Sequence, residues 1–242
     1  MPGYRLLPAG DTAVVVEFGD RIDRAVNARV LACAERIAAA RIEGVIEIVP
    51  TFRSLTIHYE PLVLPLPQLS AEIERLMVHA GAAAISGRIW RLPVCYDRQF
   101  ALDLDEVMQR TGLSHEDIVA RHSGQTYHVY MLGFLPGQAY MGDLPPEMQL
   151  SRREVPRLKI PAGSLAIAMG MTCIFPMETP CGWHLIGRSP VPLWRDDAAL
   201  LTPGDAVTFA PVSLREYEDL ASRAAAGTLA IAPREAVRAD AA

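Results

Sequence analysis

Arginine and lysine alternate along a short strand pattern, RLKI, at residues 157–160. Because the side chains of a strand alternate between its two faces, Arg157 and Lys159 are expected to point the same way. The guanidinium of Arg157 can hold a carboxylate or a phosphate through two parallel hydrogen bonds. We therefore predict that Arg157 takes part in catalysis or anion binding, with Lys159 as an auxiliary contact. The alternative is a surface or interface ion pair of Arg157.

The turn that follows this strand reads PAGS, at residues 161–164. Successive backbone amides in such a turn can form a small concave site for an oxyanion. The alternative is an ordinary tight turn between strands, and the sequence contains no phosphate-binding loop of the GxxxxGKS or GxxxxGKT type. The predicted substrate or anion contacts in this part of the chain, besides Arg157 and Lys159, are Ala162, Gly163, Ser164 and Thr172.

Two further residues carry side chains that could move protons. His122 lies near the end of a predicted helix and Tyr130 in a predicted strand. A positioned histidine is the most frequent general acid or base in enzymes. The alternative for His122 is a favourable interaction of its charge with the carboxyl end of the helix. Both residues are candidate catalytic groups.

Cysteine and histidine occur close together late in the chain, at Cys173, Cys181 and His184. A Cys-x-x-His pair supplies two metal ligands, but structural zinc sites combine two such elements and this chain contains one. We therefore predict packing roles for these side chains and no metal site. The irregular spacing of the four cysteines favours reduced thiols over a disulfide framework.

An apolar segment at residues 129–145, VYMLGFLPGQAYMGDLP, is interrupted by glycines and prolines yet keeps its aromatic side chains. Loops in water usually lose such side chains. Glycine permits conformations and close approaches that other residues do not, and proline stiffens the chain. We predict a shaped, packed loop beside a site or a protein interface. The residues assigned to this loop or interface, including two from later segments, are Gly133, Phe134, Pro136, Gly137, Tyr140, Trp183 and Arg188.

The elements that must position these residues begin with a small α/β region at residues 1–85. Short β-branched runs alternate there with amphipathic helical runs. With one closing strand, the order is β-α-β-β-α-β, which is typical of a ferredoxin-like, split βαβ sheet. We therefore predict an α+β N-terminal domain of the ferredoxin-like type. Its strands are expected at 12–18, 45–49, 54–59 and 88–96, and its helices at 23–42 and 69–82.

A connecting segment at residues 86–125 holds the closing strand and two short helix patterns, at 104–112 and 114–124. The second helix pattern opens with Ser114 and Asp117, which are residue types that favour a first helical turn.

The sequence pattern changes at residues 126–212, where short strand-like runs are separated by glycine and proline turns. This pattern predicts an all-β barrel or sandwich. Residues 213–242 are expected to form a C-terminal helix, over 213–227, and a tail.

Composition limits the classes of partner. The chain has 242 residues, 50% of them hydrophobic, which suits globular domains with real cores. A net charge of -5 offers no electrostatic footprint for nucleic acid. The sequence shows neither a signal-peptide pattern nor an apolar run of about 20 residues. We expect a cytoplasmic protein whose partners are small molecules or proteins.

Several segments, taken in order, carry a family resemblance. FRSLTIHY, LGFLPG, PRLKIPAGS, GWHLIGRSP and LLTPGD resemble the family of allophanate hydrolase subunit 1, KipI and the B subunit of the bacterial ATP-dependent 5-oxoprolinase. The same module forms half of the carboxyltransferase domain of urea carboxylase. The resemblance spans residues from about 4 to 212 and implies a small α/β domain followed by a cyclophilin-like β-barrel.

Several positions depart from the usual family pattern, among them Cys173 and His184, where it typically has glycine and glutamine. Gln138 stands where the family usually has the phenylalanine of PGF, Met171 where it has a glutamine, and Cys181 where it has a glycine. A changed substrate, or loss of the reaction, is the alternative that these differences leave open.

The resemblance implies one subunit, not self-sufficient, of a hydrolase acting on C–N bonds of cyclic amides. Its expected partners are a KipA-type protein, equivalent to the C subunit of 5-oxoprolinase, and an A subunit of the LamB/YcsF type. No cofactor is expected in this chain, while the complex is expected to require ATP. The alternative function is that of a KipI-type regulator, which binds and inhibits a sensor histidine kinase without catalysis.

Overall fold

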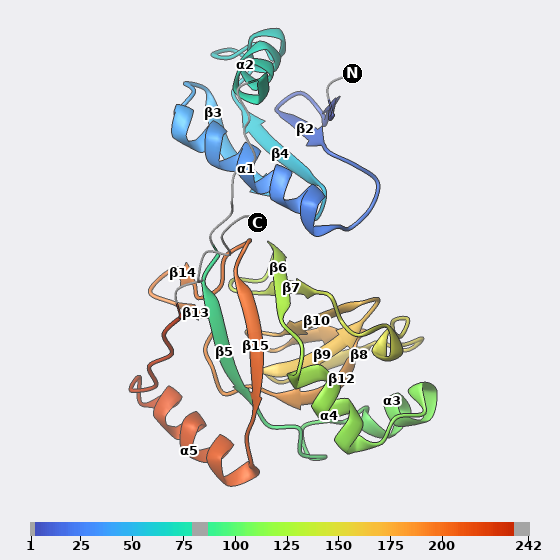
Figure 1. Ribbon diagram of the computed structural model, residues 1–242. Coiled ribbons are helices and arrows are strands. Elements are labelled where there is room, and N and C mark those ends of the chain that lie inside the picture. The colour runs from blue at the N-terminus through green and yellow to red at the C-terminus, as the bar shows by residue number, and fades with distance from the viewer. Residues whose placement is uncertain (1–2, 79–86, 235–242) are drawn as a thin grey trace, which may run out of the picture. The chain divides into compact units, whose positions relative to one another are not determined.

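The chain forms two compact units, residues 1–86 and 87–242 (Figure 1). The computed structural model describes residues 3–78 and 87–234, and each unit has its own hydrophobic core. The end of the helix predicted at 69–82 and the last part of the predicted tail lie outside the described residues. No helix within the described ranges is long and apolar enough to cross a membrane.

The first unit is a four-stranded antiparallel sheet with two helices. The strand order is β1-β2-β4-β3, and α1 packs on β3 and β4 while also contacting α2. The elements are β1 (Arg5–Pro8), β2 (Ala13–Glu17), α1 (Arg24–Ala40), β3 (Val45–Pro50), β4 (Ser54–Tyr59) and α2 (Leu66–Val78).

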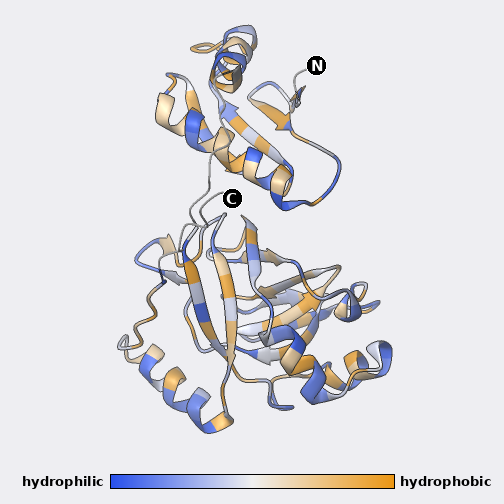
Figure 2. Ribbon diagram, in the orientation of Figure 1, coloured by the Kyte–Doolittle hydropathy of each residue, from blue (hydrophilic) through white to orange (hydrophobic). Residues whose placement is uncertain are grey.

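Local chemistry fixes both ends of α1. The carboxylate of Asp23 accepts hydrogen bonds from the amides of Ala25 and Val26, at 2.8 and 3.0 Å, which caps the first turn. The helix ends at Arg41, whose φ of 45° lies in the left-handed region. Apolar and polar residues alternate along the helix (Figure 2), and Val30 is among those buried in the core. The helix is therefore amphipathic, as its spacing predicts.

The predicted ferredoxin-like sheet is right in its first crossover and wrong in its last strand. β2, α1 and β3 form the expected unit, with β4 paired between the two strands. The strand expected at 88–96 instead pairs in parallel with a strand of the second unit, where its hydrogen bonds are used. The edge beside β2 is occupied by β1, a short Pro-terminated strand that the sequence pattern did not predict.

The second unit is built on a seven-stranded sheet of order β12-β9-β10-β7-β6-β15-β5. Its two edge strands meet where Cys95 and Arg188 exchange backbone hydrogen bonds of 2.9 and 2.8 Å. A Cβ at Gly187 would lie 2.8 Å from the Cys95 carbonyl oxygen, so the seam needs a glycine there. The sheet is a nearly closed β-barrel. Its strands are β5 (Ile89–Val94), β6 (Tyr127–Leu132), β7 (Ala139–Gly142), β9 (Ser164–Ala168), β10 (Met171–Ile174), β12 (His184–Arg188) and β15 (Ala206–Pro211).

Helices and two small ribbons surround this barrel (Figure 1). α3 packs against β12, and α4 against β15. From residue 87 on, the segment predicted as a connector (86–125) is thus part of the barrel unit, because β5 lies in its sheet and these helices pack against it. The remaining elements are α3 (Leu104–Thr111), α4 (His115–Ser123), η1 (Pro146–Met148), α5 (Leu214–Ala225), β8 (Arg157–Ile160) paired with β11 (Thr179–Cys181), and β13 (Trp194–Arg195) paired with β14 (Ala198–Ala199).

A buried carboxylate explains the LLTPGD motif. Asp205, at the start of β15, accepts hydrogen bonds from the Trp90 indole at 2.9 Å and the Thr202 amide at 2.9 Å. The Arg88 guanidinium pairs with the same carboxylate at 2.8 Å. Burial alone would raise the pKa of Asp205, but the hydrogen bonds from Arg88, Thr202 and Trp90 hold it below its usual value. The motif therefore anchors β5 to the turn before β15.

Candidate functional site

The glycine-rich segment predicted as a packed loop is a β-hairpin made of β6 and β7. The amide of Gly133 donates to the carbonyl of Gln138 at 2.7 Å, and the Gln138 amide donates to Leu135 at 3.0 Å. Gly137 has a φ of 80°, and a Cβ on it would lie 2.5 Å from the Leu193 carbonyl oxygen. The predicted packing holds for Gly137 and Gln138, which are buried, but not for the tip, where Phe134 is 93% exposed. The second strand of the hairpin, β7, was not predicted, because glycine and proline interrupt the strand pattern.

The tip of this hairpin forms one wall of a groove of about 190 Å³, here called the aromatic groove. Trp183 forms edge-to-face contacts with Tyr140 and Phe175, at ring-centre distances of 5.9 and 6.3 Å. The groove is lined by hairpin residues Phe134, Leu135, Gln138 and Tyr140, by Arg152 and Phe175, and by residues 179–183.

One amide side chain belongs to this lining. Gln138 is 5% exposed, and its Nε2 donates a long hydrogen bond of 3.5 Å to the Cys173 sulfur. Within the described part of the chain, no hydrogen bond reaches its Oε1. Since this oxygen is not one of the buried, unsatisfied side-chain atoms of the described residues, it is accessible and free to accept from a ligand donor.

Arg152 brings a positive charge to the same groove. Its guanidinium is exposed and has no ion-pair or hydrogen-bond partner among residues 3–78 and 87–234. The charge of Arg152 acts on Tyr140, which lines the groove. Burial raises the pKa of the Tyr140 hydroxyl, and the nearby Arg152 partly offsets that rise.

Arg157, the arginine favoured by the sequence, forms an ion pair instead. Its Nη1 lies 2.7 Å from Oδ2 of Asp103, and Arg153 bonds the other oxygen of the same carboxylate. Asp103 is 2% exposed, and its Oδ2 also accepts the Leu185 amide at 2.8 Å. The structure thus shows the ion-pair alternative for Arg157, in a network that joins the start of α3 to β8 and β12.

The network extends through Glu106 on α3. Arg153 donates to Glu106 at 2.6 Å, and Arg110 pairs with the same carboxylate at 3.4 Å. The buried His184 lies nearby, with its Nε2 2.9 Å from the Ser151 carbonyl oxygen. These contacts hold the segment before β8 against α3, and so they position Arg152 beside the groove.

The other predicted anion contacts of this region lie apart from the groove lining. Lys159 pairs with Glu178 at 2.8 Å on the surface of the β8–β11 ribbon. The Gly163 amide donates to Phe175, at 2.7 Å, and the Ser164 amide to Pro161, at 3.3 Å. Both amides are used within the fold, so the turn at 161–164 is an ordinary tight turn at these two residues.

The carbonyl of Ala162 is also engaged, because it accepts a hydrogen bond of 2.9 Å from the Arg188 Nε. The Arg188 guanidinium also lies over the Phe100 ring, at 5.6 Å. Arg188 therefore fastens the barrel seam, while the role predicted for it was at a partner interface.

His122 and Thr172 lie together in the barrel core. The Tyr96 hydroxyl lies 2.8 Å from Nδ1 of His122, and the Thr172 hydroxyl lies 3.0 Å from Nε2. Because Thr172 donates its own proton to the Ala166 carbonyl, Nε2 of the histidine is the donor and Nδ1 the acceptor. Both side chains are fully buried. Their position supports a structural role in place of proton transfer or anion binding.

Tyr130 is also buried, on β6. Its hydroxyl lies 3.5 Å from Oδ1 of Asp143. Its ring fills the space that a Cβ at Gly142 would need, with a closest distance of 2.3 Å. Tyr130 does not line the aromatic groove.

Stability should depend on pH through His122. Burial lowers the pKa of His122 from 6.5 to about 3. Between pH 6.5 and 3, this histidine is therefore protonated in the unfolded chain and neutral in the folded chain. The contribution is present above pH 6.5 and is lost as pH falls toward 3, by up to about 1.4 kcal/mol per pH unit. Urea unfolding at pH 7.0, 6.0 and 5.0, followed by tryptophan fluorescence, measures this slope.

The matched variant is His122→Gln, which keeps a polar side chain without a titrating group. Its absolute stability is expected to fall, but its slope between pH 7 and 5 should be smaller than that of the parent chain. Equal slopes in the two proteins would contradict the assignment.

The cysteine and histidine cluster has no ligand geometry. All four cysteines are free and buried. Burial raises the pKa of Cys173 to about 12, so the thiol is protonated at neutral pH and is no nucleophile. Within the described residues, no three histidine, cysteine, aspartate or glutamate side chains gather to hold a metal ion.

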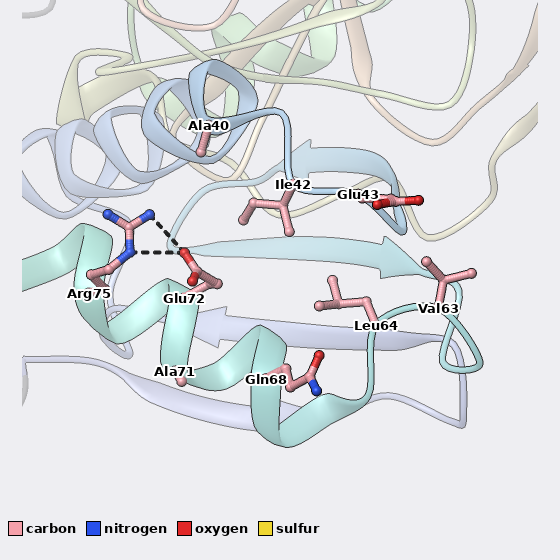
Figure 3. Close-up of a pocket in the computed structure, with 9 residues that line it drawn as sticks. All are labelled: Ala40, Ile42, Glu43, Val63, Leu64, Gln68, Ala71, Glu72 and Arg75. Atoms are coloured by element: carbon pink, nitrogen blue, oxygen red, sulfur yellow. Dashed lines mark hydrogen bonds and ion pairs between the residues drawn. The ribbon is translucent and has the colours of Figure 1, made fainter.

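A larger hollow, of about 550 Å³, lies in the first unit (Figure 3). Ile42 and Glu43 follow α1 on one side, and α2 supplies Glu72 and Arg75 on the other. Arg75 donates to Glu72 at 3.0 and 2.7 Å, so these charges are neutralised within the helix. None of the residues predicted to carry chemistry lines this hollow. We therefore place the candidate site in the aromatic groove.

Sequence reasoning found part of this groove and missed its charge. Phe134, Tyr140 and Trp183 were predicted beside a site or interface, and the structure brings all three to the groove. Arg152 and Phe175 were not singled out. Three arginines lie within six residues of one another, and the sequence does not say which of them Asp103 would neutralise.

The fold and the groove together define a class of protein, a barrel-bearing module with a small groove lined by aromatic side chains. The family model named "Carboxyltransferase domain, subdomain C and D" matches residues 4–202. The chain belongs to this carboxyltransferase-domain family.

Individual relatives agree with this assignment. The chain is 36% identical over 228 residues to the B subunit of 5-oxoprolinase from Bacillus subtilis, covering 88% of this chain and 95% of the relative. A crystal structure of the protein TTHA0988 superposes with a TM-score of 0.75 at 34% identity, covering 83% of this chain. The chain spans 40% of the length of that protein.

Urea amidolyase of Kluyveromyces lactis shares the fold. It matches with a TM-score of 0.81 at 20% identity, covering 96% of this chain and 16% of the longer protein. The same module therefore occurs in a separate protein of nearly the same length and within much longer chains.

Proposed function

We propose that this chain is the B-type subunit of an ATP-dependent, multi-protein enzyme that opens a cyclic amide, with 5-oxoproline as the substrate. The observation that carries the proposal is the match to the B subunit of a 5-oxoprolinase, which spans 95% of that relative. Its name states the substrate, and 5-oxoproline is a cyclic amide. Opening of that ring is therefore the reaction that the relative supports for this chain.

The surface around the groove supports a shared site. Phe134 at the hairpin tip is 93% exposed, and Leu158 on the neighbouring β8–β11 ribbon is 90% exposed. Exposed apolar side chains beside a groove are typical of an interface whose aromatic anchors lose water on binding. We propose that a KipA-type protein, the C-type partner, covers this face, and that a LamB/YcsF-type protein, the A-type partner, completes the enzyme. ATP would be used by the assembled complex.

A kinase-inhibitor role of the KipI type is the second function expected from the sequence. The relative matched along nearly its whole length is named as part of an enzyme, which favours the enzyme. No feature of the groove described above specifically favours a kinase partner.

Reconstitution tests the proposal. The chain, co-expressed with its C-type and A-type partners, is expected to elute as one complex and to hydrolyse 5-oxoproline only when ATP is present. The chain alone should show no turnover, because the proposed reaction is that of the assembled subunits. Gel filtration and a glutamate-release assay measure both results. A stable three-protein complex without hydrolysis would exclude this substrate.

Two matched variants test the interface separately from the chemistry. Phe134→Ser is expected to weaken the complex by at least about tenfold, because hot-spot aromatics commonly contribute about 2 kcal/mol or more. Leu62→Ser removes an equally exposed apolar side chain from the first unit and should leave assembly unchanged. Equal behaviour of the two variants would contradict a docking role for the hairpin tip.

A further inference from the structure

We propose that the aromatic groove binds a small cyclic amide that carries a carboxylate, with Gln138 recognising the amide and Arg152 the carboxylate. This inference rests on the proposed function and adds to it the substrate contacts of this chain. It assigns to Arg152 the anion-binding role that the sequence gave to Arg157.

The shape and lining of the groove select the kind of molecule. Its volume of about 190 Å³ is small, and Trp183 and Phe175 stand nearly perpendicular to each other, with an interplanar angle of 89°. Tyr140 adds a third ring against Trp183. Such a pocket favours a compact ring over an extended chain, because its volume is small and aromatic side chains form part of its walls.

Gln138 supplies the matching polar group. A side-chain carboxamide carries a donor and an acceptor side by side, and so does the N–H and C=O edge of a lactam. The two groups can form a pair of hydrogen bonds, as asparagine or glutamine does with the edge of adenine. In Gln138 the Nε2 is held only by a long contact to Cys173, and the Oε1 has no partner within the described residues. Both atoms are therefore open to a ligand.

Arg152 is the one arginine of its segment that the protein leaves for a ligand. Arg153 and Arg157 are both bound to Asp103, and this buried carboxylate also accepts the Leu185 amide. Among the described residues no carboxylate pairs with Arg152, although it lines the groove. A guanidinium in this position binds a ligand carboxylate through two hydrogen bonds.

Titration calorimetry with three related molecules tests the assignment on the full chain and on the assembled complex. The probe is 5-oxoproline, which has both a carboxylate and a lactam. 2-Pyrrolidone lacks the carboxylate, and cyclopentanecarboxylate lacks the amide. The wild-type chain should bind 5-oxoproline more tightly than either partial ligand, and its binding should weaken as salt screens the charge on Arg152.

Two variants should separate the two contacts. Arg152→Gln is expected to weaken the binding of 5-oxoproline and cyclopentanecarboxylate by about tenfold and to leave the binding of 2-pyrrolidone unchanged. Gln138→Met introduces a side chain of nearly the same size. It should weaken the binding of 5-oxoproline and 2-pyrrolidone by about tenfold and leave the binding of cyclopentanecarboxylate unchanged. Arg98→Gln removes an exposed arginine that pairs with Asp105 outside the groove, and should change none of the three.

The outcomes separate this inference from the proposed function. If the complex hydrolyses 5-oxoproline and neither variant changes binding or KM, the groove assignment is wrong and the enzyme assignment stands. If the complex is inactive but the chain binds 5-oxoproline in the expected variant pattern, the groove stands and the reaction is wrong. The assignment of the groove as the binding site is wrong if the variants lose affinity equally for all three ligands. It is also wrong if neither the chain nor the complex binds 5-oxoproline.

Discussion

Replacing Asp103 with asparagine is expected to lower the unfolding free energy of the second unit by about 3 to 5 kcal/mol. The side chain is 2% exposed, and its two oxygens accept from Arg153, Arg157 and the Leu185 amide. Asparagine has the same shape but no charge, so it would leave two partly buried guanidiniums without their common partner. Breaking a buried ion pair in this way costs far more than the pair itself contributes.

The measurement can be confined to the second unit. All three tryptophans, Trp90, Trp183 and Trp194, lie in residues 87–242, so urea unfolding followed by tryptophan fluorescence reports that unit. At about 2 to 4 °C per kcal/mol, the melting temperature should fall by about 6 to 20 °C.

The matched control lies two residues away, in the first turn of α3. Asp105 is 81% exposed and pairs with the exposed Arg98, so Asp105→Asn should cost less than about 1 kcal/mol. If the two variants cost the same, Asp103 is not the centre of the network, and the ion pair of Arg157 would again leave room for a role in anion binding.

Local signals in the sequence predicted the elements that depend on neighbouring residues. Ser114 and Asp117 form a reciprocal capping box at the start of α4, as their residue types predict, and Ser213 with Glu216 does the same for α5. In these turns, donor and acceptor are three residues apart, so a short window of sequence holds all the information needed. The helix bounds were accordingly close to those observed.

Pairing between distant segments was not predictable in the same way. β5 and β15 are paired residue by residue although more than a hundred residues separate them, as Trp90 and Val207 illustrate. Periodicity indicates that a strand forms but not which strand it joins, because every strand offers the same backbone hydrogen bonds. This is why the strand at 88–96 was assigned to the wrong sheet.

The candidate site was only partly predictable for a related reason. The aromatic residues of the hairpin stand out by composition, because a surface loop would lose them. The charge at the groove depends instead on which arginines form ion pairs with Asp103. The two that do so, Arg153 and Arg157, lie 50 and 54 residues from Asp103 in the sequence. Asp103 itself carried a weak signal, as an aspartate directly before a predicted helix, where a capping role is the common one.

The hairpin and the groove both depend on the absence of a Cβ atom at Gly137. Gly137→Ala is expected to destabilise the second unit by about 2 to 5 kcal/mol and to abolish ligand binding in the groove. Its φ of 80° costs any other residue about 1 to 2 kcal/mol. The added Cβ would also lie 2.5 Å from the Leu193 carbonyl oxygen, a backbone atom that cannot rotate away as a side chain could.

Gly112→Ala separates these two causes. Gly112 ends α3 with a φ of 74°, and a Cβ there meets no atom within 4 Å, so it carries the conformational cost alone. We expect about 1 to 2 kcal/mol for Gly112→Ala with normal binding of 5-oxoproline, because the end of α3 does not line the groove. The difference between the two variants, measured by urea unfolding and calorimetry, is then the cost of moving the hairpin away from Leu193. Equal costs and intact binding in both would mean that the hairpin tip moves freely, and a groove built on it could not hold Gln138 in place for a ligand.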